Sequence, residues 1–136
     1  MKKIAKIMCS FMLILMVALS ATACGISNNY ERVEEKLDDE GYTVYTLKGS
    51  SKIEAALNSL GMDADPDDIE CVMTAEDGDE FIYLVFFEKT KAAKEFYEDF
   101  ESDGEELLDY MDVNGEVGRD GKVVYMGTKR AIKDAK

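Results

Sequence analysis

The segment from Phe81 to Phe87 (FIYLVFF) is a run of seven apolar and aromatic residues without a charge. A strand with one solvated face alternates apolar and polar residues, so an unbroken run predicts a central strand that is covered on both faces. Ile82, Leu84 and Phe86 share one face of such a strand, and the alternate residues share the other. The fold must therefore cover both faces of one sheet, with the chain itself or with a partner.

The segments around this strand predict a single α+β domain. The expected strands are rich in β-branched and aromatic residues: 42–47, 69–75, 81–87 and 122–126. The expected helices follow residues that can cap them: Asn29, Ser51, Thr90 and Thr128. Gly41 and Gly61 fit helix stops, and Gly104 is expected to interrupt the third helix. The Asp-Gly pair at 77–78 predicts a hairpin between the second and third strands.

The order of these elements predicts a topology. Without the first and last helices, the order is strand, helix, strand, strand, helix, strand. This βαββαβ order is typical of a ferredoxin-like antiparallel sheet with its helices on one face, here with an extra N-terminal helix and a short C-terminal helix. A cystatin-like sheet or another α+β sheet is the alternative. The segment Glu116 to Arg119 lies between two turn signals and is not assigned to a strand.

A ferredoxin-like sheet leaves one face of the central strand without helices. Tyr30, Val33 and Leu37 recur at helical spacing, which predicts that the N-terminal helix covers this face. The alternative is an interaction surface, in which a homodimer or a protein partner binds Ile82, Leu84 and Phe86.

The first 23 residues have the three parts of a secretory signal. Residues 1–6 contain three lysines, residues 7–19 carry no charge, and residues 20–23 are small. The uncharged core is shorter than the roughly 20 residues of a spanning helix, although an uncleaved anchor helix remains the alternative.

The stretch Ala21-Thr22-Ala23-Cys24 resembles the lipobox of bacterial prolipoproteins. The resemblance covers residues 1–24, and Ala21 stands where Leu is usual in the family. It implies cleavage between Ala23 and Cys24, a diacylglycerol on the Cys24 thiol, and attachment to the outer face of the cell membrane. We expect the cell to be Gram-positive. The expected organisation is a signal peptide over 1–23, a lipidated cysteine with a short tether over 24–29, and the domain over 30–136.

The charge of the chain limits its partners. All 29 acidic residues follow residue 23, whereas only 13 of the 16 basic residues do, so residues 24–136 carry a net charge of −16. The negative field of these charges repels nucleic acid and broad anionic lipid surfaces, so neither is expected as a partner. Cationic ligands and metal ions are still possible partners. The C-terminus is locally basic, because it contains Lys129, Arg130, Lys133 and Lys136. These residues are expected to form a charged helix face or, alternatively, to contact anionic lipid near the anchor.

The composition disfavours an enzyme. The chain has no His, which excludes Ser-His-Asp and Cys-His catalysis and His-rich zinc sites. Cys71 belongs to an alternating apolar set with Ile69, Met73 and Ala75, so a buried structural thiol is expected rather than a nucleophile. Cys9 would leave with the signal peptide and Cys24 would carry lipid, so no intrachain disulfide is expected.

The sequence therefore predicts a non-enzymatic binding or interaction module with no cofactor other than its lipid. The second prediction is weak binding of a divalent cation or a cationic ligand through an acidic loop that contains Asp63, Asp65, Asp67 and Asp68. This loop lacks the spacing of an EF-hand, because its sixth position is Asp68 rather than Gly. An enzyme of unknown type is the third possibility.

Overall fold

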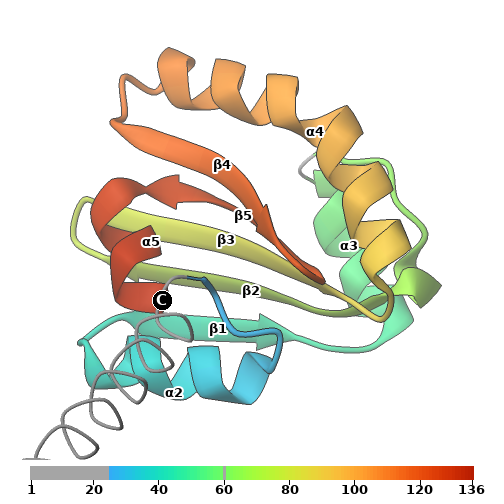
Figure 1. Ribbon diagram of the computed structural model, residues 1–136, viewed down its shortest axis with the longest axis horizontal. Coiled ribbons are helices and arrows are strands. Elements are labelled where there is room, and N and C mark those ends of the chain that lie inside the picture. Colours follow the sequence, from blue (N-terminus) through green and yellow to red (C-terminus); the bar gives the residue numbers. More distant parts are fainter. Residues whose placement is uncertain (1–24, 60) are drawn as a thin grey trace, which may run out of the picture.

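The computed structural model describes residues 25–59 and 61–136. The expected signal peptide 1–23, Cys24 and Leu60 lie outside the described residues. The described part forms four α-helices, one 3-10 helix and one antiparallel sheet of five strands (Figure 1). In chain order the elements are α2 (Tyr30–Asp39), β1 (Thr43–Leu47), α3 (Ser50–Ser59), η1 (Pro66–Asp68), β2 (Ile69–Asp77), β3 (Glu80–Phe87), α4 (Thr90–Tyr110), β4 (Gly115–Asp120), β5 (Val123–Thr128) and α5 (Lys129–Ala135).

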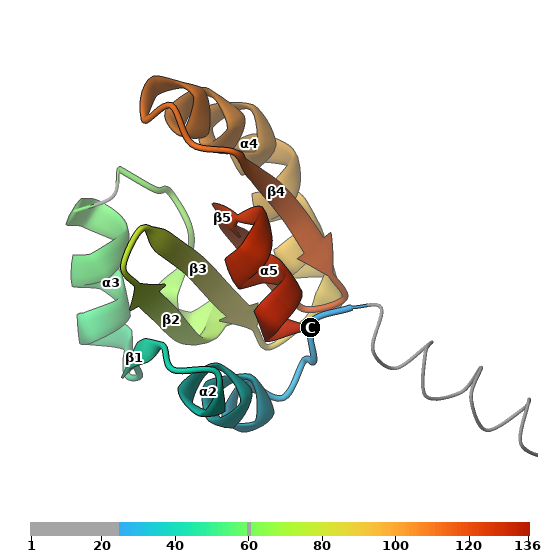
Figure 2. The ribbon, with the colours of Figure 1, turned by 90° about the vertical axis from the view of Figure 1, so that its left-hand side faces the viewer.

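The sheet is the middle of three layers. Its strand order is β1-β2-β3-β5-β4, which places β3 at the centre. α2 and α5 pack on one face, and α3 and α4 pack on the other (Figure 2). Ile82, Leu84 and Phe86 belong to the core on the α2 and α5 face, and Val85 and Phe87 belong to the core on the α3 and α4 face. The prediction that β3 is covered on both faces is confirmed.

The ferredoxin-like strand order is not the one observed. A split βαβ unit places another strand between the two parallel strands that the helix connects. Here β1 and β2 are direct neighbours and antiparallel, with Leu47 opposite Val72. The reason is the path that the chain takes after α3. This helix is about 15 Å long. Residues 61–68 are long enough to retrace the helix, so β2 begins at the end of the sheet where β1 stops.

The fifth strand, β4, was not assigned from the sequence. It pairs with β5 along its whole length, from Gly115 opposite Thr128 to Asp120 opposite Val123. Its sequence contains two glycines and several charged residues, so it lacks the apolar pattern that predicts a strand. An edge strand does not need such a pattern. At Gly118 the ring of Tyr125 occupies the space that a side chain would fill.

A β-bulge interrupts the alternation of β2. The register against β3 shifts between Ile69 and Cys71. Because a bulge adds one residue to its strand, the residues before it change faces. Cys71, Met73 and Ala75 share one face as expected, and this face points toward α2 and α5. Ile69 belongs to the core on the opposite face, together with Val72. The prediction that Ile69 shares the face of Cys71 is wrong for this reason.

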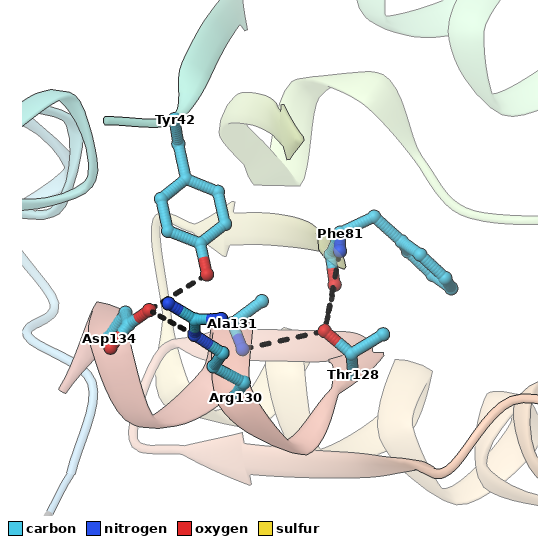
Figure 3. A network of polar contacts seen from close by, with 6 residues as sticks. All are labelled: Tyr42, Phe81, Thr128, Arg130, Ala131 and Asp134. Carbon is cyan, nitrogen blue, oxygen red and sulfur yellow. Dashed lines mark hydrogen bonds and ion pairs between the residues drawn. The ribbon is translucent and has the colours of Figure 1, made fainter. Parts of the chain in front are cut away.

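Capping side chains define the first and last helices. The Asn29 side chain accepts a hydrogen bond from the Glu31 backbone N–H, and Gly41 ends α2 with a φ of 93°. Thr128 caps α5, where its hydroxyl oxygen accepts from the Ala131 N–H at 3.4 Å (Figure 3). Thr90, by contrast, is the first residue of α4 rather than its cap. The signals at Asn29, Gly41 and Thr128 are thus confirmed, and Thr90 is displaced by one residue. The prediction that Ser51 caps its helix is wrong, because α3 already begins at Ser50.

A buried polar contact joins α5 to the start of β1. The Tyr42 hydroxyl donates a hydrogen bond of 2.8 Å to the Asp134 carboxylate, and the Arg130 guanidinium lies 3.9 Å from the same oxygen (Figure 3). Burial, followed by the hydrogen bond to Asp134, raises the pKa of Tyr42 above its ordinary value. The contact ties α5 to the face that α2 also covers.

Residues 25–29 are part of the packed domain rather than a free tether. Ile26 is 3% exposed and belongs to the core that contains α2 and α5. Its backbone N–H donates to the Asp120 carboxylate at 2.8 Å. A domain boundary at residue 30 is therefore too late, and the fold includes the residues from 25 onward.

α4 is one continuous helix of 21 residues, so Gly104 does not interrupt it. Gly104 faces β4, and a Cβ at this position would lie 2.8 Å from the Val117 Cγ2 atom and 3.1 Å from the Phe100 ring. The missing side chain therefore allows the helix to approach the edge strand closely.

We predict that Gly104→Ala lowers the free energy of unfolding by about 1 kcal/mol. Overpacking costs about 1–3 kcal/mol, which exceeds the helix-propensity gain of about 1 kcal/mol. Urea denaturation measures the change, with the exposed Ser102→Ala in the same helix as control. In a Val117→Ala background, Gly104→Ala should no longer destabilise. An equal effect in both backgrounds would contradict the role assigned to the Val117 contact.

Candidate functional site

A groove opens between α3 and α4 on the face of the sheet opposite α2 and α5. Its volume is about 530 Å³, which falls within the range of small-molecule sites. Tyr83 of β3 and Met126 of β5 are cross-strand neighbours that line it. The remaining lining residues come from the turn after α3, from α4 and from the C-cap of α4: Gly61, Met62, Asp63, Phe96, Asp99, Phe100, Asp103, Leu107 and Met111.

The end of α3 positions one wall of the groove. Gly61 has a φ of 68°, which a glycine adopts without steric cost and which ends the helix. Its backbone N–H donates to Asn58, and that of Met62 donates to Leu57. This turn places Met62 and Asp63 at the groove.

One face of α4 forms the other wall. Phe96, Phe100, Leu107 and Met111 recur at intervals that lie on one side of an α-helix. The rings of Phe96 and Phe100 are stacked, with centroids 5.4 Å apart and planes at 19°. Phe96 also contacts Phe87 in the core, at 5.3 Å between centroids. The aromatic wall is therefore fixed to the sheet.

Large apolar side chains remain exposed at this wall. Leu107 is 41% exposed and Met111 is 40% exposed, and both line the groove. Clustered exposed apolar residues around a concavity are typical of a binding surface.

The charged groups that line the groove are all acidic. Asp63, Asp99 and Asp103 are exposed on its walls. A smaller cavity of about 160 Å³ shares Asp63, Phe96 and Asp99 with it and adds three further acids: Asp65, Asp68 and Glu95. Neither cavity is lined by Lys or Arg. The potential in the groove is therefore negative, and the lining favours a cation with an apolar body.

The four aspartates of the predicted acidic loop do not converge on one point. Asp65 caps η1 by accepting from the Asp67 N–H at 3.0 Å, and the Ser50 hydroxyl donates to the Asp67 carboxylate at 3.1 Å. Asp63 lines the groove, and it shares the smaller cavity with Asp65 and Asp68. Over the described residues, no group of three or more Asp, Glu, His or Cys side chains is arranged to hold a metal ion. The geometry gives no support to the divalent-cation alternative.

The expected interaction surface is inside the core. Ile82, Leu84 and Phe86 are each 0% exposed. α2 covers them as one alternative predicted, and α5 contributes Ala131, Ile132 and Ala135 to the same core. A dimer or partner cannot reach these three side chains in the folded domain.

The cysteine at position 71 has the environment of a structural residue. Cys71 is buried and unpaired, and desolvation by burial raises the pKa of its thiol to about 12. A thiol with so high a pKa is a poor nucleophile at neutral pH. Cys24 and Ala23, the predicted lipidation and cleavage positions, lie outside the described residues.

The groove residues on α4 and β3 escaped sequence reasoning. Phe96 and Phe100 lie four residues apart in the sequence, but no local pattern distinguishes a side chain on a groove wall from one in a sealed core. One sequence signal for the groove wall was available. Leu107 and Met111 are apolar residues beside acidic ones near the end of the helix.

Comparisons with known proteins identify no relative. No protein-family model matches the chain, and no curated protein and no solved structure matches it. Within residues 25–59 and 61–136, no helix combines the length and the apolarity that crossing a membrane requires.

We predict that the domain loses stability as the pH rises from about 9 to 12. Cys71 keeps its proton in the folded state, whereas an exposed thiol with the ordinary pKa of 9.0 releases it. The unfolded state then binds fewer protons, so the free energy of unfolding falls by about 1.4 kcal/mol per pH unit for this group. Tyr125, whose pKa burial raises to about 12, adds to the loss above pH 10.

Urea denaturation between pH 7 and 11 measures this dependence. Cys71→Ala should give a shallower slope from pH 9 upward, and Tyr42→Phe, as the comparison variant, should change the slope only above pH 10. Identical slopes for Cys71→Ala and the parent chain would contradict the prediction.

Proposed function

We propose that this chain is a membrane-anchored lipoprotein of the extracytoplasmic side, whose domain binds a small organic cation in the groove between α3 and α4. The observation that carries the ligand class is the groove itself, with its aromatic and thioether lining and its exclusively acidic charges. The lipid anchor rests on the resemblance of residues 21–24 to a lipobox.

The lining supplies two kinds of attraction for such a ligand. Tyr83, Phe96 and Phe100 offer aromatic rings, which bind ammonium and guanidinium groups through their negative faces. Asp99 and Asp103 lie four residues apart on α4 and add charge at the entrance. An apolar body would contact Leu107 and Met111, and its cationic group would lie near the carboxylates.

The same lining favours binding over catalysis. It contains carboxylates, thioethers, aromatic rings and one phenol, and neither a serine hydroxyl nor a thiol. The chain has no His to act as a general base near neutral pH. We therefore propose a binding module without enzymatic activity and without a cofactor other than the lipid.

The location can be tested on protein isolated from membranes of a bacterial host. Intact-mass analysis should show a chain that begins at Cys24 and carries a diacylglycerol. Cys24→Ser should abolish the modification, whereas Cys9→Ser, the matched control, should leave it unchanged. An unmodified chain that begins at Met1 would contradict the proposed anchor.

The ligand class can be tested by calorimetry with phenylbutylammonium and its neutral counterpart phenylbutanol. We expect the cation to bind more tightly and Asp99→Asn plus Asp103→Asn to weaken it about three- to tenfold, since each exposed pair contributes about 0.2–1 kcal/mol. Added salt should weaken the binding of phenylbutylammonium and leave the binding of phenylbutanol unchanged.

The matched control is Asp109→Asn, which removes the same charge from α4 outside the groove. It should leave the affinity for phenylbutylammonium unchanged. Equal binding of the two probes, or an equal effect of all three substitutions, would contradict the proposed ligand class.

A further inference from the structure

The chain that follows the proposed lipidation position is held against the domain from its first described residue. Ile26 is buried in the core, and its N–H donates to the Asp120 carboxylate at 2.8 Å. Asn28 bridges the same turn, where its side-chain NH₂ donates to the Asp120 carbonyl at 3.1 Å. The side-chain oxygen of Asn28 accepts from the Lys122 N–H at 2.6 Å. These contacts fix residues 25–28 to the turn between β4 and β5.

Because residues 25–28 are held against the domain, they cannot act as a flexible spacer between the domain and the bilayer. A free segment of five residues would span at most about 17 Å. With Ile26 buried, only Gly25 lies between the core and Cys24, and consecutive Cα atoms are about 3.8 Å apart. Any lipid on Cys24 is then attached next to the β4–β5 turn.

The surroundings of Gly25 suit a headgroup layer. Figures 1 and 2 both show the end of α5 beside the first described residues. Lys122 on the turn and Lys133 on α5 are exposed. The carboxylates of Asp120 and Asp134 also lie nearby, where they accept hydrogen bonds from Ile26 and Tyr42. Each lysine close to an anionic phospholipid surface contributes about 1 kcal/mol of attraction.

We propose that the β4–β5 turn and the end of α5 form the surface that rests on phospholipid headgroups in the anchored protein. This inference rests on the proposed lipidation of Cys24. The groove lies on the opposite face of the sheet, between α3 and α4, so contact through the turn leaves it open to ligand.

The absence of Trp from the chain allows a direct test. A single Trp is introduced at Lys122 on the turn, or at Tyr110, which is 87% exposed and precedes β4. β4 separates the two positions by roughly 17 Å. The lipidated chains, beginning at Cys24, are placed in vesicles of phosphatidylcholine and phosphatidylglycerol that contain a lipid with a doxyl group near its headgroup. We expect quenching of Lys122→Trp to exceed that of Tyr110→Trp several-fold.

A linker variant tests the cause of this orientation. Twelve Gly and Ser residues inserted between Cys24 and Gly25 restore slack without altering the fold, so quenching of Lys122→Trp should fall toward that of Tyr110→Trp. Equal quenching of the two Trp variants, or no effect of the linker, overturns the orientation and leaves lipidation standing. A chain that carries no diacylglycerol by mass and does not float with the vesicles overturns both.

Discussion

The two faces of β3 bury five large apolar side chains, and each α-helix of the described chain packs into one of the two cores that contain them. Full burial of one such side chain contributes about 1.5–3 kcal/mol, so together they supply roughly 10 kcal/mol. That is comparable to the whole net stability of a typical domain. Without α2 and α5 the strand would expose Ile82, Leu84 and Phe86, and the sheet could not remain soluble as a monomer.

The groove follows from how the other face is covered. α3 packs on β2, whereas α4 packs chiefly on β4 and β5, where Gly104 allows close approach. Figure 2 shows α3 and α4 over different parts of the same face of the sheet. The groove between them is lined at its base by Tyr83 of β3 and Met126 of β5. A helix pair that sealed this gap would need larger side chains where the chain has acidic residues. The candidate site is thus a consequence of the same layered packing that stabilises the fold.

Local signals predicted the parts of the fold that depend on neighbouring residues. The central strand, the Asp-Gly hairpin and the caps at Asn29 and Thr128 each arise from a few adjacent side chains. The strand order was not predictable, because it depends on the path that residues 61–68 take after α3. The bulge before Cys71 and the continuity of α4 through Gly104 depend on packing between distant segments. The groove escaped prediction for the same reason, since its walls meet in space and not in sequence.

The hydrogen bond between Ile26 and Asp120 joins residues 94 positions apart. Contacts at such separation form late, because loop closure costs entropy that only the nearly complete fold repays. During folding, the start of the described domain must wait for β4, β5 and α5 before it can dock. The cleavage proposed above, before Cys24, would therefore meet an undocked chain first and a folded surface only afterwards. The order of folding itself sets the interval in which the N-terminal region is accessible.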